Sequence, residues 1–453
     1  MRVRLFVVML YLVRTMSLCL IVFAISGCAS HGLIQNQSIA QLNNSDGYSL
    51  ASFSKDFGKR DHGLMLAFSG GGTRAAALSY GVLAQLRETQ VFDQAKTHRL
   101  LDDVGIISAV SGGSFTAAYY GLHGDKLFED FEDDFLRKNV EKSLLSSLLN
   151  PLHWFSSINR TEYAIRYYEA EVFKGATFAD MMRPGAPMVL INATDLTRGV
   201  RFSFMQEYFN LLCSDLASFP VSRAVAASSA VPLLFKPVVV ENHPGCSVGK
   251  PAWLESAKVR AETDPELTLT VKGLESYFDK TNHRYAHLVD GGISDNLGLR
   301  TIFDVTRLLG GTKQMLQYLK IDEVSRFVII SVDASTQPDT QMGASKNAPS
   351  IANTINAMTD IQLHRYNTAT VAQMKRSLSE WGRELSNSDQ PLDAYFIRLS
   401  FDQIKDPETR RYINQIPTSF ALSDEQVDAV IKAGRDLLLE NQEFQRLLRD
   451  INR

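Results

Sequence analysis

The sequence predicts an α/β fold in which helices cover both faces of a mainly parallel central sheet, a three-layer α/β/α arrangement. Four short apolar segments, 64–68, 104–110, 188–192 and 327–332, have the length of buried strands. The first two end in glycine runs, and helical patterns follow them, such as the one over 75–86. Apolar strands that alternate with helices are typical of a parallel sheet with helices on both sides.

The chain begins with a segment that we expect to be an export signal. Arg2, Arg4 and Arg14 precede a compact apolar run, and small residues lead up to Cys28. This order of basic, apolar and small residues is typical of a secretory signal. The apolar run has about ten residues, whereas a helix that spans a bilayer needs about 20. A membrane anchor over 5–25 is the alternative, although Arg14 interrupts it.

The residues around the expected processing site resemble a bacterial lipobox, Ile25-Ser26-Gly27-Cys28. In such lipoproteins the cysteine becomes the lipidated first residue of the mature chain. The resemblance therefore implies that residues 1–27 are a lipoprotein signal peptide and that Cys28 carries the membrane anchor, which would be stable with several acyl chains. No aspartate follows the cysteine, which implies a place in the outer membrane of a bacterial cell envelope. A cleaved signal with a chance cysteine is the alternative.

The next segments differ in polarity. Residues 28–60 are rich in Gln, Asn, Ser and Asp, and we expect them to be a polar tether after the lipidated cysteine. Residues 128–142 have the pattern of an amphipathic helix, and the apolar, aromatic segment 144–155 would cover the core or dip into lipid. Residues 251–282 form a charged insertion without a strong pattern.

The carboxy-terminal part, 304–453, is expected to form an α/β extension that packs on the same domain. It contains a helical pattern over 353–377 and a strand pattern over 395–401. Ser423 and Gln426 are spaced as a capping box, which predicts that a helix begins there.

Composition excludes several classes of protein. The 453 residues carry a formal net charge of −3, so a polycationic nucleic-acid binder is not expected. Of the four cysteines, Cys19 lies in the signal and Cys28 in the lipobox. Cys213 and Cys246 remain, and an exported protein could pair them in a disulfide. Two unpaired buried cysteines are the alternative.

The first chemical motif is a glycine run at the end of the first predicted strand. Gly70, Gly71 and Gly72 precede Thr73 and Arg74 at the start of a helical pattern. Glycines in this place expose backbone N–H groups beside a helix N-terminus, which suits a phosphate or a developing oxyanion. The run also fits a dinucleotide fingerprint, G-x-G-x-x-A.

Two further motifs follow predicted strands. Ser111 stands at the end of the strand over 104–110, with Gly112 and Gly113 directly after it, like a nucleophile elbow. A serine in an ordinary strand-to-helix turn is the alternative. Asp290 ends a short apolar segment and precedes Gly291 and Gly292. A carboxylate there could face a site as a base, or it could bond to its own turn.

Together the three motifs resemble the patatin-like phospholipase family in type, order and spacing, over residues 64–303. The segments 192–195 and 226–232 are also similar to parts of that family. Ala109 and Ala75 stand where the family pattern has glycine, and both are small. The resemblance implies a patatin-like fold with a Ser–Asp dyad.

The resemblance also implies roles for individual residues. Ser111 would be the nucleophile, and Asp290 would accept its proton and later activate water. The N–H groups of the glycine run would form the oxyanion hole, and Arg74 would hold the loop or bind anionic lipid. The supporting glycines would be Gly113, Gly291 and Gly292. We expect the pKa of Asp290 to be shifted by partial desolvation.

The implied function is the hydrolysis of lipid acyl esters, of phospholipase A or lysophospholipase type, in lipid catabolism or remodelling. A membrane lipid would be the substrate. Transfer of the acyl group to an acceptor other than water is a close variant, and a catalytically silent envelope lipoprotein is another alternative. An oxidoreductase is disfavoured because the next predicted strand has no acidic residue at its end.

The histidines argue against a triad or a metal site. Only His364 follows Asp290, in a helical stretch, and His287 precedes it on the same strand approach. No H-E-x-x-H or similar metal-binding spacing occurs in the sequence. We therefore expect no metal and no cofactor.

Overall fold

The structure is a computed structural model. It describes residues 32–41, 47–57, 63–93, 96–142, 159–232, 234–246, 249–319, 321, 326–337, 346, 348, 350–386 and 392–452. The signal segment, the lipobox with Cys28 and the apolar segment 144–155 lie outside the described residues.

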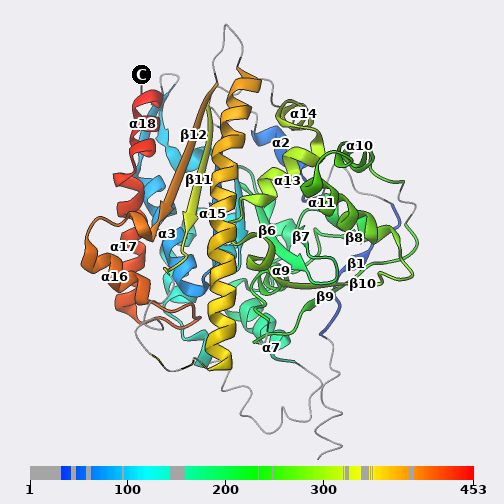
Figure 1. Cartoon of the computed structure of the whole chain (residues 1–453), viewed down its shortest axis with the longest axis horizontal. Helices are drawn as coiled ribbons and strands as arrows, with labels where there is room; N and C mark the ends of the chain where they lie inside the picture. The colour runs from blue at the N-terminus through cyan, green and yellow to red at the C-terminus, as the bar shows by residue number, and fades with distance from the viewer. Residues whose placement is uncertain are drawn as a thin grey trace, which may run out of the picture.

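An eight-stranded sheet forms the centre of the molecule (Figure 1). Along the sheet its strands are β12 (Asp393–Ser400), β11 (Arg326–Asp333), β2 (Gly63–Phe68), β5 (Val104–Val110), β6 (Met188–Asp195), β10 (Tyr285–Asp290) and β9 (Val238–Glu241), and β7 (Val200–Ser203) pairs with β6. The pairings from β12 to β6 are all parallel, whereas β10, β9 and β7 join antiparallel.

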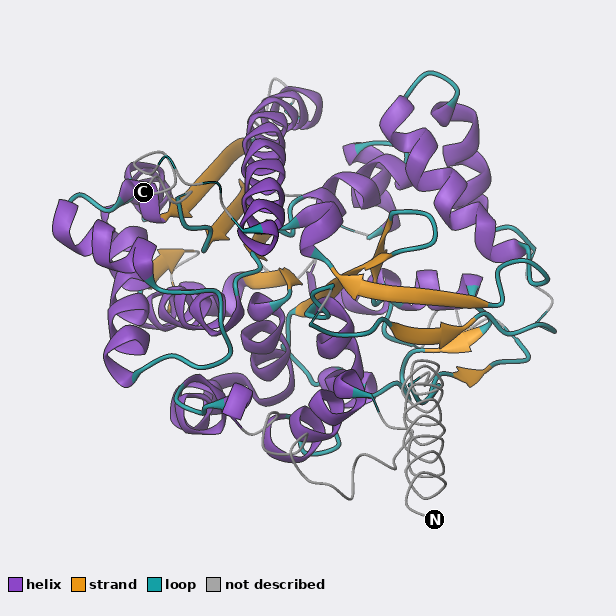
Figure 2. Ribbon diagram, turned by 60° about the horizontal axis from the view of Figure 1, so that its bottom comes forward, coloured by secondary structure: helices purple, strands orange, loops and turns teal. Residues whose placement is uncertain are grey.

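Helices lie on both sides of this sheet, above and below the orange strands in Figure 2. The longer helices are α3 (Gly72–Glu88), α4 (Gly112–His123), α10 (Ala252–Ala261), α11 (Pro265–Glu275), α13 (Arg300–Leu309), α15 (Ile351–Leu385), α17 (Asp424–Glu440) and α18 (Gln442–Ile451). The shorter ones are α2 (Leu50–Phe57), α5 (Leu127–Phe131), α7 (Arg160–Tyr167), α8 (Gln206–Leu211), α9 (Val221–Ser228), α12 (Gly292–Asp295), α14 (Thr312–Tyr318) and α16 (Pro407–Gln415). The predicted three-layer α/β/α fold with a mainly parallel sheet is confirmed.

Continuous apolar strands form the middle of the sheet because both faces are covered. Every residue of β2, β5 and β6 is buried. In parallel strands of this kind, ligands bind beyond the carboxyl ends. Two of the predicted motifs follow β2 and β5 directly, so the sheet brings them to the same edge.

The carboxy-terminal part belongs to the same sheet. β11 pairs with β2 and with β12, so the two strands after residue 303 continue the sheet in register. Helix α17 packs on α3 at a close crossing. A Cβ atom on Gly434 would lie 2.6 Å from the Leu78 carbonyl oxygen, and one on Gly81 would lie 2.2 Å from the Ile431 carbonyl oxygen. Glycine lets the two helix backbones approach at this crossing.

The expected polar tether is wrong for residues 32–41 and 47–57. The short strand β1 (Gln37–Ser38) pairs with β8 (Ser214–Asp215). The side chain of Asn36 donates to the Glu241 carbonyl oxygen and accepts from the Glu241 N–H, at 2.8 and 2.9 Å. Tyr48 is fully buried and bonds to the backbone of Val189 through its hydroxyl. The polar composition of this segment did not predict that it docks on the protein, because backbone and amide groups make the contacts through hydrogen bonds.

Two other segments differ from their sequence predictions. The charged insertion contains the helices α10 and α11, and the Asp264 side chain caps α11 at Glu266 and Leu267 N–H. The amphipathic helix expected over 128–142 is divided: α5 passes into a π-helical turn, Glu132–Leu136. Phe131, the last residue of α5, and Phe135, in the turn, are both buried, with ring centroids 5.5 Å apart.

Among the residues that the structure describes, no helix is long and apolar enough to cross a membrane.

Candidate active site

Ser111 occupies a sharp turn between β5 and α4. Its φ angle is +50°, a left-handed conformation that costs free energy for a residue with a side chain. A Cβ atom on Gly112 would lie 2.0 Å from the Gly72 carbonyl oxygen, and one on Gly113 would lie 2.7 Å from the Ser69 carbonyl oxygen. Only glycine fits after the serine, which explains the Ser-Gly-Gly order at this turn.

Asp290 lies against this serine. The Ser111 hydroxyl donates a hydrogen bond of 2.9 Å to Asp290 Oδ2. The Gly292 N–H donates one of 2.7 Å to Asp290 Oδ1, so each carboxylate oxygen has a partner. Burial raises the pKa of Asp290 to about 6, although these two hydrogen bonds lower it in part. The carboxyl group is thus within hydrogen-bond reach of the hydroxyl and has a pKa suited to a base near neutral pH.

The glycines after Asp290 are required by close packing. A Cβ atom on Gly291 would lie 2.3 Å from the Asn192 carbonyl oxygen. One on Gly292 would lie 3.0 Å from Asp290 Oδ1 itself. A side chain at Gly291 would collide with the backbone, and one at Gly292 would press on the carboxylate itself, so the turn favours glycine at both positions.

Ser228, at the end of α9, holds the backbone of the dyad. Its hydroxyl accepts the N–H of Ser111 at 2.8 Å and donates to the Asn192 carbonyl oxygen at 2.6 Å. The Thr194 hydroxyl donates to the Asp290 carbonyl oxygen at 3.0 Å. No local signal in the sequence indicates these roles, although the residues lie in the segments 192–195 and 226–232, which resemble parts of the family.

The glycine loop lies beside the serine, but its three glycines differ. The Gly70 N–H donates to the Asn296 carbonyl oxygen at 2.9 Å, so Gly70 is wrong as an oxyanion donor. A Cβ atom on Gly70 would lie 2.7 Å from Asn296 Oδ1, which explains its lack of a side chain. Within the described structure, the N–H groups of Gly71 and Gly72 have no hydrogen-bond acceptor. These two N–H groups are the candidate oxyanion donors.

Arg74 fixes the glycine loop from behind. Its guanidinium donates to the carbonyl oxygens of Ala334 and Ile416 and to the Thr418 hydroxyl. Burial lowers its pKa to about 10, which leaves it charged at neutral pH. The contacts of Arg74 support one of its two expected roles, which is to hold the glycine loop. The buried side chain is directed into the protein, so the role in binding anionic lipid is wrong.

The carboxy-terminal part also contacts the loop directly. The Thr73 N–H donates to the Ser419 carbonyl oxygen at 2.9 Å. A Cβ atom on Gly72 would lie 2.5 Å from that oxygen. The glycine loop is therefore held by residues more than 340 positions later in the chain. No local sequence signal indicates this contact.

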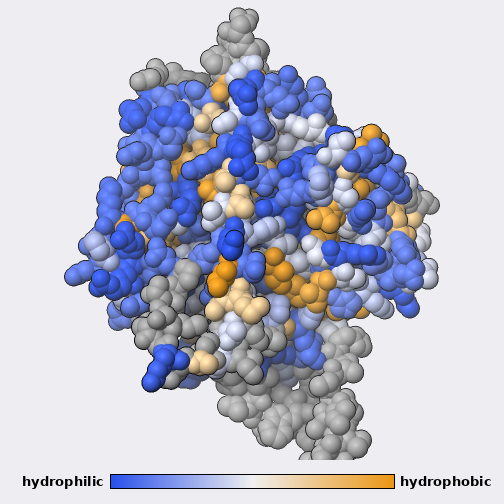
Figure 3. Space-filling view, viewed as in Figure 1, coloured by the Kyte–Doolittle hydropathy of each residue, from blue (hydrophilic) through white to orange (hydrophobic). Residues whose placement is uncertain are grey.

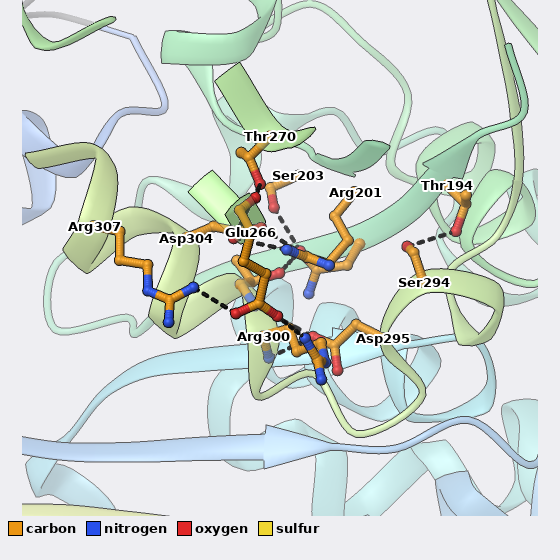
Figure 4. Close-up of polar contacts among 12 residues, drawn as sticks. Thr194, Arg201, Ser203, Glu266, Thr270, Ser294, Asp295, Arg300, Asp304 and Arg307 are labelled. Carbon is orange, nitrogen blue, oxygen red and sulfur yellow. Dashed lines mark hydrogen bonds and ion pairs between the residues drawn. The ribbon is translucent and has the colours of Figure 1, made fainter. Parts of the chain in front are cut away.

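A polar network, buried at Arg201 and Asp304 and half-buried at Glu266 and Arg307, supports the chain that follows Asp290 (Figure 4). Arg201 forms a two-pronged ion pair with Asp304 at 2.6 and 2.7 Å. Glu266 lies between Arg300 and Arg307 and pairs with both. These pairs join β7, α11 and α13, so they fix α13, the second helix after Asp290.

Asp295 belongs to the same network and has an unusual environment. Its Oδ2 accepts the N–H groups of Arg300 and Thr301 at 2.7 and 3.2 Å, which anchors the start of α13. Within the described part of the chain, its Oδ1 is buried and has no hydrogen-bond partner. Burial raises the pKa of Asp295 to about 6.

Cys213 and Cys246 are joined by a disulfide in the structure. The Cys213 carbonyl oxygen accepts the N–H of Ile39 at 2.9 Å, so the amino-terminal segment docks beside this bridge. Among the described residues, no cluster of three or more His, Cys, Asp or Glu side chains is arranged to hold a metal ion.

A cavity of about 940 Å³ lies away from the dyad, between β12, α16 and α17. Its lining is rich in charged side chains that pair with each other, such as Lys432 with Asp436 and Lys405 with Glu440. It holds neither the serine nor the glycine loop, so the candidate site is placed by side-chain geometry, not by cavity size.

Comparison with known proteins gives a family and a set of distant structures. The model of the patatin-like phospholipase family matches residues 66–303, more than half of the chain. No curated protein sequence matches the chain. Human GIVD cytosolic phospholipase A2 is 12% identical, with a TM-score of 0.42, and the match covers 89% of this chain and 62% of that one. The chain thus spans less than two thirds of the length of that enzyme.

Two bacterial structures are also similar. VipD from Legionella pneumophila is 11% identical with a TM-score of 0.31, and the match covers 86% of this chain and 67% of that one. Full-length ExoU of the Pseudomonas aeruginosa type III secretion system, solved with SpcU, is 14% identical with a TM-score of 0.21, over 94% and 98% of the two chains.

Proposed function

We propose that this chain, which belongs to the patatin-like phospholipase family, hydrolyses acyl esters of membrane lipids with Ser111 and Asp290 as a catalytic dyad. One observation carries the proposal: the serine hydroxyl donates to a buried carboxylate 2.9 Å away, beside two glycine N–H groups that have no acceptor among the described residues. This arrangement combines a nucleophile, a base and oxyanion donors, which acyl transfer requires.

The reaction would proceed in two steps. Ser111 Oγ attacks the ester carbonyl while Asp290 accepts its proton, and Asp290 then gives that proton to the departing alcohol as the ester C–O bond breaks. The N–H groups of Gly71 and Gly72 stabilise the negative charge on the carbonyl oxygen, and one such donor typically contributes roughly 2.7–4 kcal/mol. Asp290 next takes a proton from water, which attacks the acyl-serine, and it returns this proton to Ser111 Oγ as the fatty acid is released. Phospholipids and lysophospholipids are the proposed substrates, in lipid catabolism or remodelling.

The test uses an active-site label and two variants. We expect a fluorophosphonate to label the wild type at Ser111 and not Ser111→Ala, with loss of activity on short acyl esters in that variant. Asp290→Asn should remain folded and lose most of both signals. Wild-type protein that is folded and unlabelled would instead support the catalytically silent alternative. Product analysis with an added alcohol separates hydrolysis from acyl transfer.

We also propose that Cys28 is lipidated and anchors the enzyme in the bacterial outer membrane. The disulfide between Cys213 and Cys246 supports export, because such bridges persist in oxidising compartments. Incorporation of labelled palmitate into the wild type, and its loss in Cys28→Ala, would be the expected result. Equal incorporation in both proteins would contradict the assignment of Cys28.

A further inference from the structure

The amino-terminal segment is attached to the protein a few residues after the proposed anchor. Arg223 on α9 donates to the Leu33 carbonyl oxygen at 2.9 Å and to Gln35 Oε1 at 2.8 Å. The same guanidinium pairs with Glu162 on α7 at 2.6 Å, and Glu162 accepts the Leu33 N–H at 3.3 Å. This buried pair fixes Leu33 to the two helices.

The attachment limits how far the protein can stand from a membrane. Leu33 follows Cys28 by five residues, and five residues span at most about 18 Å when fully extended. A lipid on Cys28 would therefore hold Leu33 within about 18 Å of the bilayer surface, which is less than the width of two helices side by side.

The attachment point is also close to the dyad. Helix α9 begins at Val221 and ends at Ser228, whose hydroxyl accepts the N–H of Ser111. Arg223 and Ser228 are five residues apart, or about 7.5 Å along the helix axis. Helix α9 thus connects Arg223, which binds the amino-terminal segment, with Ser228, which binds the backbone of Ser111.

Exposed apolar side chains occur at both ends of this connection. Leu33 is 50% exposed, Leu234 is 57% exposed, and Ile293, three residues after Asp290, is 52% exposed. The Leu234 carbonyl oxygen accepts from Arg160 at the start of α7, at 3.3 Å. In Figure 3, hydrophobic surface gathers over the lower half of α15 and the region of α9 and β9. In Figure 1 the amino-terminal segment runs from β1 toward this lower end.

Basic side chains accompany the apolar ones. Arg160 and Lys236 are exposed, and the Thr161 hydroxyl joins their segments by bonding to the backbone of Lys236 at 2.8 Å. Apolar side chains with basic neighbours are typical of surfaces that lie on an anionic membrane interface.

We infer that Leu33, Leu234 and Ile293, with Arg160 and Lys236, form a docking surface that lies on the same membrane leaflet in which Cys28 is anchored. The enzyme would then take its lipid substrate from its own membrane and not from an opposing one. This inference rests on the proposed hydrolase function and on the proposed anchor. It follows from the short chain between Cys28 and Leu33 and from the closeness of that docked segment to the dyad.

The experiment compares two membranes in one tube. Full-length lipidated protein is reconstituted into phosphatidylglycerol and phosphatidylethanolamine vesicles that carry a fluorogenic phospholipid. Protein-free vesicles of the same composition carry a phospholipid of a second colour. We expect hydrolysis in the anchoring vesicle to be at least about tenfold faster, since the docked enzyme cannot reach the second bilayer. Equal rates in the two populations would overturn the inference.

Surface variants test the contact itself. The double variant Leu33→Ser/Leu234→Ser should lower hydrolysis in the anchoring vesicle about tenfold, because two apolar contacts with the interface are lost. Its activity on a soluble short-chain ester should be unchanged. The matched control is Val259→Ser/Leu269→Ser, on α10 and α11, where the side chains are 69% and 72% exposed. The control should behave like the wild type.

The outcomes separate the two proposals. Wild type that cleaves neither vesicle lipid nor the soluble ester would contradict the hydrolase function. Wild type that cleaves the soluble ester, together with a Leu33→Ser/Leu234→Ser variant that cleaves vesicle lipid at the full rate, would contradict only the docking surface.

Discussion

Asp290 is subject to two opposing effects. Burial raises the pKa of its carboxyl group, and the hydrogen bonds from Gly292 and Ser111 lower it. The result, about 6, is far enough above the ordinary value for a stronger base and still leaves the group mostly ionised at neutral pH. These two hydrogen bonds, of 2.7 and 2.9 Å, therefore keep the buried carboxylate able to act as a base.

The first prediction concerns the pH dependence of activity. Only ionised Asp290 can accept the Ser111 proton, so kcat/KM for a soluble ester should fall about tenfold for each pH unit below about 6 and level off above it. Circular dichroism at pH 5 should show that the protein is still folded. A profile that is flat down to pH 4.5 would rule out Asp290 as the base.

The second prediction concerns the cost of this carboxylate to stability. Burial raises the pKa of Asp290 from 3.8 to about 6. The ionised carboxylate therefore destabilises the folded state at pH 8 by about 3 kcal/mol. Below the pKa of the unfolded state, Asp290 is protonated in both the folded and the unfolded protein, and this destabilisation vanishes. Asp290→Asn should therefore raise the free energy of unfolding at pH 8 by about 1–3 kcal/mol. Urea unfolding measures this change, and a variant less stable than wild type at pH 8 would contradict it.

At the scale of the element, much of the fold follows from local pattern. The apolar runs predicted β2, β5, β6 and β11. Strands that are buried on both faces of a parallel sheet do not alternate polar and apolar residues, so a continuous apolar run is a sufficient signal. The capping box at Ser423 is present, and α17 begins at the next residue. The amino-terminal docking could not be predicted, because Asn36 bonds to residues some 200 positions away.

The residues of the candidate site likewise fall into those with a local sequence signal and those that depend on tertiary contacts. Ser111 and Asp290 were predicted because each follows a strand with glycines after it, which is a local feature. Gly70 was assigned wrongly, because the partner of its N–H, Asn296, lies far along the chain. Ser228 and Ser419 contact the site through tertiary packing, and a serine in sequence carries no sign of such a role.

The third prediction compares two helical glycines. In Gly434→Ala the new Cβ atom would lie 2.6 Å from the Leu78 carbonyl oxygen, so α17 must move from α3 at a cost of about 1–3 kcal/mol. In Gly382→Ala, on α15, the nearest atom is 3.7 Å away, and the helix should gain about 0.5–1 kcal/mol. Urea unfolding of both variants measures the difference. Equal effects would mean that the α3–α17 crossing is not tight.

At the scale of the whole molecule, the catalytic loop depends on both parts of the chain. The family match ends at residue 303, yet β11 extends the sheet beside β2, and Arg74 donates to Ala334, Ile416 and Thr418. The carboxy-terminal part therefore completes the layer around the glycine loop and is not a separable appendage.

The last prediction is that the protein is more stable at pH 5 than at pH 8. Burial raises the pKa of Asp290 and Asp295 to about 6 and that of Glu207 to about 7. Between pH 5 and 8 the folded state thus binds more protons than the unfolded state, so stability falls as pH rises. The depressed pKa of Glu266, about 2, matters only below pH 5. Two groups oppose the trend: burial lowers the pKa of His123, and it lowers the pKa of Lys280 to about 8, so Lys280 acts only near the upper end of this range.

Urea unfolding at several pH values measures this slope. Asp290→Asn provides the control, because removing one of the three carboxyl groups should flatten the slope by about a third if the three contribute equally. Asp295 should contribute in particular, since its Oδ1 is buried and has no hydrogen-bond partner among the described residues. A free energy of unfolding that rises from pH 5 to pH 8 would show that these carboxyl groups are hydrated in solution and that the site is more open than its burial indicates.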